Sequence, residues 1–170
     1  MFGSWDNFYI LLGSAAGALI GLLFIVVTLT AGLDREQALR GASRYMTPTL
    51  TAFSAVLLVS AIASAPLSAG LQRAVLLVVA LVLLGWALVN VWRMFFPDCG
   101  APTHWTDPWW YAAAPAAGYL ALFAVAGLGS ALGVGAVALA MLMLGVRNAW
   151  DLITWIAPRG PAGDATPPPE

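Results

Sequence analysis

The side chains of this sequence that could do chemistry are the few polar and ionisable groups set inside long apolar stretches. They lie near the ends of two such stretches, and they are Asn90, Arg93, Arg147, Asn148 and Asp151. A charge at the centre of a membrane span costs about 3 kcal/mol on insertion scales, so a charge kept there has a structural or functional use. Arg147 and Asp151 are four residues apart, which predicts an ion pair on one helix face. This candidate polar cluster either anchors the helices or binds an ion, a lipid head group or a partner.

No catalytic constellation accompanies these residues. The sequence has one histidine and one cysteine, and it contains no glycine-rich phosphate loop, no HExxH motif and no GxSxG motif. We therefore expect no catalytic residues, no bound cofactor and no enzymatic activity.

Metal-ligand side chains are densest between residues 98 and 107. Cys99 and His104 lie there, five residues apart, with Asp98 and Asp107 on either side of them. That spacing matches none of the usual zinc sites, which need four ligands. We expect an ordinary loop without metal, and the alternative is a metal site assembled across subunits.

Composition identifies the kind of protein that must position these groups. Hydrophobic residues make up 61% of the chain and charged residues 9%, whereas soluble domains carry about 25% charged residues. The chain is therefore an integral membrane protein. No alternating strand pattern is present, so we predict an all-α membrane helix bundle. The net charge of −1 argues against a nucleic-acid partner.

Apolar runs separated by prolines and polar turns predict five transmembrane helices within residues 1–157. These spans cover residues 8–29, 48–65, 73–95, 108–128 and 131–156. Thr47 before Pro48 and Asp107 before Pro108 each predict a cap followed by a first helical residue, and Ser130 predicts the cap of the last helix. Residues 158–170 are rich in proline and glycine, which predicts a disordered tail.

Pro115 lies inside the fourth predicted span. A proline lacks the N–H group that an α-helix needs at that position, so it frees a backbone carbonyl. We expect a kink there and a donor from a neighbouring helix that satisfies the carbonyl.

The first predicted span carries Gly13, Gly17 and Gly21, one every fourth residue. This spacing places the three glycines on one helix face, where another helix backbone can approach closely. The partner is a helix of the same chain, a second copy in a homo-oligomer, or another membrane protein.

Arginine distribution predicts the orientation. Six of the seven arginines fall on one side of the membrane under a five-span reading, and they are Arg35, Arg40, Arg44, Arg93, Arg147 and Arg159. Only Arg73 falls on the other side. The positive-inside rule then places the N-terminus outside and the C-terminus inside.

Two stretches of the sequence carry a resemblance. They are FYILLGSAAGALIGLLFIVVTL, which starts at Phe8, and RNAWDLITW, from Arg147 to Trp155. They resemble a loose group of short bacterial multi-pass membrane proteins, some of which are labelled modulators of a membrane-bound ATP-dependent protease. The resemblance implies an accessory role and assigns no functional residues.

Two functions follow as hypotheses. The first is an accessory, scaffold or modulator protein of a bacterial inner membrane, which packs against other membrane proteins through the glycine face. The alternative is a small homo-oligomeric channel or transporter lined by the candidate polar cluster. The outer halves of the predicted spans hold almost no ionisable or amide residues, which favours the accessory role, because a pathway needs such residues at several depths.

Overall fold

The structure is a computed structural model that describes residues 2, 5–29, 45–96 and 105–156. Its elements in chain order are α1 (Asp6–Leu29), α3 (Thr47–Ser64), α4 (Ala69–Phe95), η2 (Trp109–Ala113), α5 (Ala114–Gly127) and α6 (Ala131–Ile156). With η2 and α5 counted as one span, five helices in this described part of the chain are long and apolar enough to cross a membrane. The predicted all-α bundle of five spans is therefore confirmed. The predicted tail, residues 158–170, lies outside the described residues.

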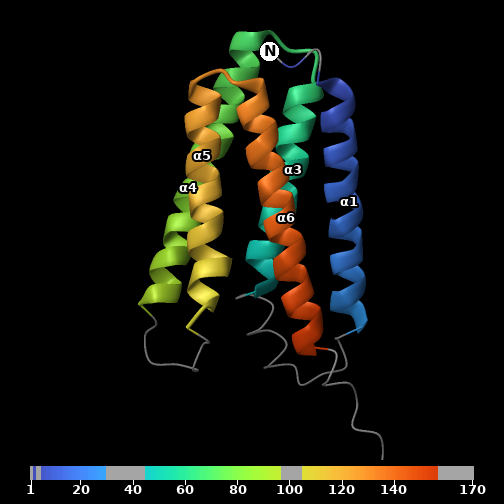
Figure 1. Ribbon diagram of the computed structural model, residues 1–170, viewed down its shortest axis with the longest axis vertical. Coiled ribbons are helices and arrows are strands. Elements are labelled where there is room, and N and C mark those ends of the chain that lie inside the picture. The colour runs from blue at the N-terminus through green and yellow to red at the C-terminus, as the bar shows by residue number, and fades with distance from the viewer. Residues whose placement is uncertain (1, 3–4, 30–44, 97–104, 157–170) are drawn as a thin grey trace, which may run out of the picture.

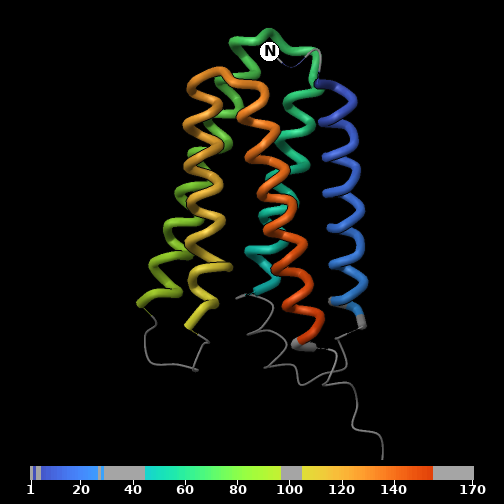
Figure 2. Tube along the Cα trace, in the orientation of Figure 1, coloured from blue at the N-terminus to red at the C-terminus, as the bar shows by residue number. Residues whose placement is uncertain are grey.

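The spans run alternately up and down, side by side (Figure 1). Helix α3 packs between α1 and α6, and α5 packs between α6 and α4. Figure 2 shows that the start of α1 and the start of α6 lie at one end of the bundle, while the end of α6 and the start of α3 lie at the other. Helix α3 is the central helix, since 56% of its span is buried, compared with 17% of the α4 span.

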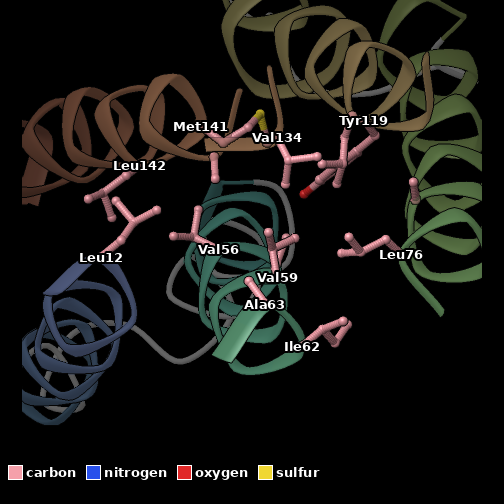
Figure 3. Close-up of a cluster of buried hydrophobic side chains, with 14 of the residues drawn as sticks. Leu12, Val56, Val59, Ile62, Ala63, Leu76, Tyr119, Val134, Met141 and Leu142 are labelled. Carbon is pink, nitrogen blue, oxygen red and sulfur yellow. The ribbon is translucent and has the colours of Figure 1, made fainter. Parts of the chain in front are cut away.

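Apolar side chains fill the interior of the bundle. Figure 3 shows them converging from all five spans, with Val59 of α3 and Val134 of α6 near the middle. The same cluster is completed around its periphery by Leu12 of α1, Leu76 of α4 and Tyr119 of α5. Close packing of this kind, rather than transfer from water, holds helices together in lipid.

The turn between α5 and α6 follows the expected chemistry. Gly129 has a φ of 70°, and the Ser130 and Gly129 N–H groups donate to the carbonyls of Val125 and Ala126 at 3.1 and 3.0 Å. This is the Schellman arrangement, which favours glycine because its residue sits in the left-handed region. The Ser130 hydroxyl accepts from the Gly133 N–H at 3.0 Å, so the predicted cap is confirmed.

The predicted cap at Thr47 is wrong. The helical turn extends back through Tyr45 and Met46, and Met46 has helical backbone angles without a side-chain cap. Pro48 tolerates this because the first turn of a helix has no intrahelical partner for its N–H groups. Helix α4 likewise begins earlier than predicted, at Ala69 instead of 73, where the Ser68 hydroxyl accepts from the Leu71 N–H.

Candidate functional site

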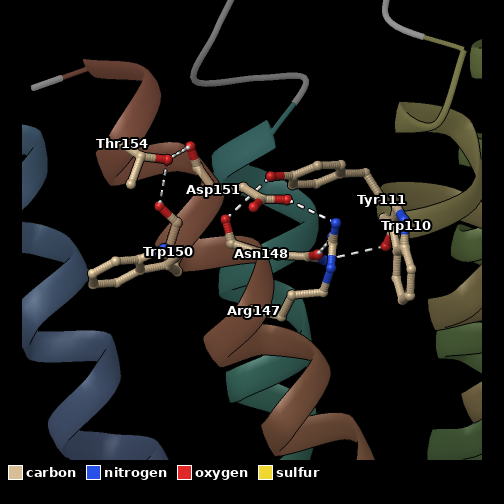
Figure 4. Close-up of polar contacts among 7 residues, drawn as sticks. All are labelled: Trp110, Tyr111, Arg147, Asn148, Trp150, Asp151 and Thr154. Atoms are coloured by element: carbon tan, nitrogen blue, oxygen red, sulfur yellow. Dashed lines mark hydrogen bonds and ion pairs between the residues drawn. The ribbon is translucent and has the colours of Figure 1, made fainter. Parts of the chain in front are cut away.

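Polar side chains of α6 meet the first turn of the η2–α5 span at the end of the bundle where α6 finishes. Trp110 and Tyr111 come from η2, and Arg147, Asn148 and Asp151 come from α6 (Figure 4). We call these five residues the α6–η2 network. Three of them belong to the candidate polar cluster, and Trp110 and Tyr111 join it from η2.

Arg147 is held on three sides. Its guanidinium forms an ion pair with the Asp151 carboxylate at 3.0 Å, and this pair confirms the prediction from the four-residue spacing. The Arg147 Nη1 donates to Asn148 Oδ1 at 3.1 Å. The Arg147 Cζ also lies 3.8 Å from the centre of the Trp110 ring, within the range of a cation–π interaction. The guanidinium is therefore fixed before anything binds to it.

Asn148 is the buried centre of the network, with 1% of its surface exposed. Its Nδ2 donates to the Trp110 carbonyl at 3.2 Å. The Tyr111 hydroxyl donates to the Asn148 backbone carbonyl at 3.1 Å. One amide side chain thus joins α6 to the π-turn on one side and to Arg147 on the other.

The Trp110 carbonyl needs this donor because of Pro115. The η2 turn is a π-helix in which the Ala114 N–H donates to the Trp109 carbonyl, five residues back. In the same register the Trp110 carbonyl would accept from residue 115, and proline has no N–H to give. The expected donor from a neighbouring helix is therefore present, and it is Asn148. The sequence did not reveal the π register, which selects the carbonyl that is freed.

A second pair of aromatic and acidic groups extends the network toward α3. The Tyr45 hydroxyl donates to Asp107 Oδ2 at 2.9 Å, and the Tyr45 and Tyr111 rings meet edge to face with centres 5.0 Å apart. Asp107 was predicted to cap the fourth span. Its carboxylate instead ties the start of that span to the start of α3.

Asn90 and Arg93 lie apart from the network. Both are on α4, which packs against α5 and η2. Among the described residues, no hydrogen bond or ion pair joins either side chain to α6, and the Asn90 Nδ2 is buried without a partner. The prediction placed all five residues of the candidate polar cluster at one depth, and α4 holds two of them on a different side of the bundle.

The three glycines of α1 have unequal surroundings. A Cβ at Gly13 would lie 2.9 Å from the Ser60 Cβ of α3, so this glycine permits close approach within the chain. A Cβ at Gly17 or Gly21 would meet no described atom within 4 Å. Among the described residues, another helix of the chain therefore packs closely on the predicted glycine face only at Gly13.

Other glycines that the sequence analysis did not single out permit close contacts inside the bundle. A Cβ at Gly145 of α6 would lie 2.6 Å from the Phe53 ring, and one at Gly135 would lie 3.1 Å from the Phe8 ring. Each lies in an apolar run, and nothing else in the sequence marks it.

The predicted metal-ligand group cannot be placed in full. Asp98, Cys99 and His104 lie outside the described residues, and within the described ranges no three side chains of metal-binding type gather. The expectation of an ordinary loop, and the alternative of a site shared between subunits, both stay predictions.

Comparison of this chain with protein-family models, with curated proteins and with solved structures found no match.

Proposed function

We propose that this chain is an accessory protein of a membrane, without enzymatic activity, and that it docks a helix of another membrane protein on the open glycine face. By the open glycine face we mean the surface of α1 around Gly17 and Gly21. The chain itself is a multi-pass membrane protein, as its five apolar helices indicate.

The observation that carries this proposal is the contrast along one row of glycines. A Cβ at Gly13 would meet Ser60 of α3, whereas a Cβ at Gly17 or Gly21 would meet no described atom within 4 Å. Contact with lipid does not require glycine at such a position, because a larger side chain would pack against lipid equally well. Glycine does permit a second backbone to approach closely, which is how small residues act at membrane helix interfaces.

The surroundings of the two glycines fit a docking surface. Ser14 and Ala18 are small and exposed beside Gly17 and Gly21, so the small side chains form one continuous strip. Leu11, Leu22 and Ile25 are large and exposed around this strip. A helix laid over the strip would contact these flanking side chains while its backbone approaches the glycines.

The alternative of a channel or transporter has less support. Apolar side chains fill the middle of the bundle, and the charged groups of the α6–η2 network bond to one another. A pathway needs polar groups at several depths. The resemblance of residues 8–29 and 147–155 to bacterial membrane proteins labelled as protease modulators supports the accessory role and a bacterial inner membrane as the location.

Association through the open glycine face is tested with leucine substitutions. The full chain is purified from its native membrane in mild detergent, and the proteins that copurify are identified together with the mass of the complex. Gly17→Leu and Gly21→Leu should remove a partner while the melting temperature of the chain stays unchanged. Gly85→Leu is the matched control, because Gly85 of α4 is also exposed and a Cβ there meets no described atom within 4 Å.

Three results would overturn the proposal. The first is a partner that survives both substitutions on α1, and the second is a partner that is lost equally in Gly85→Leu. The third is a complex whose mass contains only copies of this chain, which would assign the face to a homo-oligomer.

A further inference from the structure

We propose that the Arg147–Asp151 pair binds the head group of an aminophospholipid, with the lipid phosphate on the Arg147 guanidinium and the lipid ammonium on the Asp151 carboxylate. This inference is independent of the proposed function. It concerns a charged pair on α6, whereas the proposed function concerns an apolar face of α1. It rests on the donors and acceptors that the pair leaves free, on their exposure and on their depth.

Arg147 has unused donors that are already oriented. A guanidinium carries five N–H groups, and the contacts with Asn148 Oδ1 and Asp151 Oδ2 engage Nη1 and Nη2. The Trp110 ring lies against the guanidinium, and three of the guanidinium N–H groups are not used by the contacts with Asn148 and Asp151. With 38% of the side chain exposed, a phosphate can reach them without unfolding any part of the bundle. Arginine is the side chain best suited to phosphate because its planar donors match two phosphate oxygens.

Asp151 decides which phosphate can bind. Its side chain is 43% exposed and uses Oδ2 for Arg147, while no hydrogen bond or ion pair among the described residues engages Oδ1. A ligand with only negative charge would be repelled by this carboxylate. A zwitterion with a primary ammonium near its phosphate places opposite charges on both members of the pair and donates N–H groups to the carboxylate. A choline head group carries the positive charge but no N–H donor.

The pair lies toward the end of the α6 span, close to the head-group layer. The span on α6 covers Ala131–Thr154, so Arg147 lies about 10 Å before its end at 1.5 Å per residue. Trp110 and Trp150 are exposed at this end of the bundle, and tryptophan favours the boundary between lipid tails and water. From this depth the long arginine side chain can reach a phosphate at the boundary of the hydrocarbon, and Asp151 lies one turn nearer to that boundary.

Buried Asn148 gives the site a rigid base. Its Oδ1 accepts from Arg147 while its Nδ2 is committed to the Trp110 carbonyl, so neither end of the amide can rotate away without leaving a buried group unpaired. The head group thus meets a guanidinium and a carboxylate whose spacing is set by the fold. Preorganisation of this kind raises affinity, because less freedom is lost on binding.

The test measures lipid binding by native mass spectrometry of the full chain in mild detergent. Short-chain phosphatidylethanolamine, its mono- and dimethylated forms, phosphatidylcholine and phosphatidylglycerol are titrated in turn. We expect phosphatidylethanolamine to bind about tenfold more tightly than phosphatidylcholine, which corresponds to one charge-assisted hydrogen bond. Affinity should fall with each added methyl group, and this series needs no variant protein.

Two variants and one control assign the effect to the pair. Asp151→Asn should abolish the preference for phosphatidylethanolamine over phosphatidylcholine and improve binding of phosphatidylglycerol. Arg147→Gln should weaken binding of all the lipids. Arg93→Gln is the matched control, because Arg93 is an exposed arginine at the same end of the bundle, and it should leave the preference unchanged.

Soluble phosphoethanolamine distinguishes the two sources of this chemistry. It should compete only at much higher concentration than the lipid, because it lacks the acyl chains that bury against the helices. Equal binding of the soluble compound would overturn the lipid as the occupant. The site would be refuted if phosphatidylglycerol bound as tightly as phosphatidylethanolamine in the wild type, or if Asp151→Asn kept the original preference.

Discussion

Replacement of Asn148 by leucine should destabilise the protein by removing the side-chain donor to the Trp110 carbonyl. Leucine branches at the same carbon as asparagine, so the shape of the side chain is largely kept. What remains is a partly buried carbonyl that has lost this donor, in a helix whose next donor position is occupied by Pro115. An unsatisfied buried group costs about 1–3 kcal/mol, and hydrogen bonds between membrane helices contribute about 0.6 kcal/mol on average and at most about 1.7. We therefore expect a loss of about 1.5 kcal/mol, toward the upper end of the membrane values.

The same reasoning predicts a rescue. Pro115→Ala restores an N–H at residue 115, and this N–H can donate to the carbonyl that Asn148 serves in the wild type. In the Pro115→Ala background, Asn148→Leu should cost only about 0.5 kcal/mol, mainly for the acceptor that Arg147 loses. The coupling between the two positions should then be about 1 kcal/mol.

The assay is reversible unfolding of the four proteins in mixed micelles with increasing denaturing detergent. The free energy of unfolding is compared across wild type, each single variant and the double variant. The effect of Pro115→Ala by itself cancels in this cycle, so it need not be known in advance. Equal costs of Asn148→Leu in the two backgrounds would refute the role that we assign to the proline and to the π-turn.

Three further predictions follow from other parts of the chain. Gly145→Ala should lower the free energy of unfolding by about 1–2 kcal/mol, because the new Cβ would lie 2.6 Å from a buried phenylalanine ring; unchanged stability in the same micelle assay would show that the ring moves freely. A double-mutant cycle with Arg147→Gln and Asp151→Asn should give a coupling of about 0.5 kcal/mol, the value for a half-exposed ion pair, and a coupling above about 2 kcal/mol would indicate a pair closed off from water. Cysteines introduced at positions 3 and 165 should be labelled from opposite sides of the membrane, whereas labelling of both from one side would contradict the predicted orientation.

The sequence was sufficient for features that depend on the order of residues along one helix. The five apolar runs follow from length and composition, the Ser130 cap from its place before the last run, and the Arg147–Asp151 pair from a spacing of four. Each of these depends on contacts within one turn or one span. Local spacing determines such contacts.

Features that depend on which helices are neighbours were not accessible. Asn90 and Arg147 lie toward the ends of two helices that finish at the same end of the bundle, and the sequence predicts this. It does not give the direction around the bundle, and α4 packs against α5 instead of α6. The same limit applies to the glycines, because a spacing of four identifies a face without showing that only Gly13 is covered by α3.

The errors at helix starts have a more local cause. Thr47 before Pro48 has the form of a cap, yet the turn continues back through Tyr45, whose carbonyl accepts from the Thr49 hydroxyl at 2.8 Å. Tyr45 is held there by its bond to Asp107 and its contact with Tyr111. Tertiary contacts at the end of the bundle therefore override the capping signal.

Site-specific photo-crosslinking tests the proposed docking of a second membrane protein most directly. A photoreactive residue at position 25 replaces Ile25, which is exposed and follows Gly21 on the same helix face. One at position 82 replaces Val82, which is an exposed residue of α4. Illumination of native membranes should give an adduct with one other membrane protein from position 25 and no such adduct from position 82. Adducts with this chain alone, or the same products from both positions, would contradict the assignment of α1 as the docking helix.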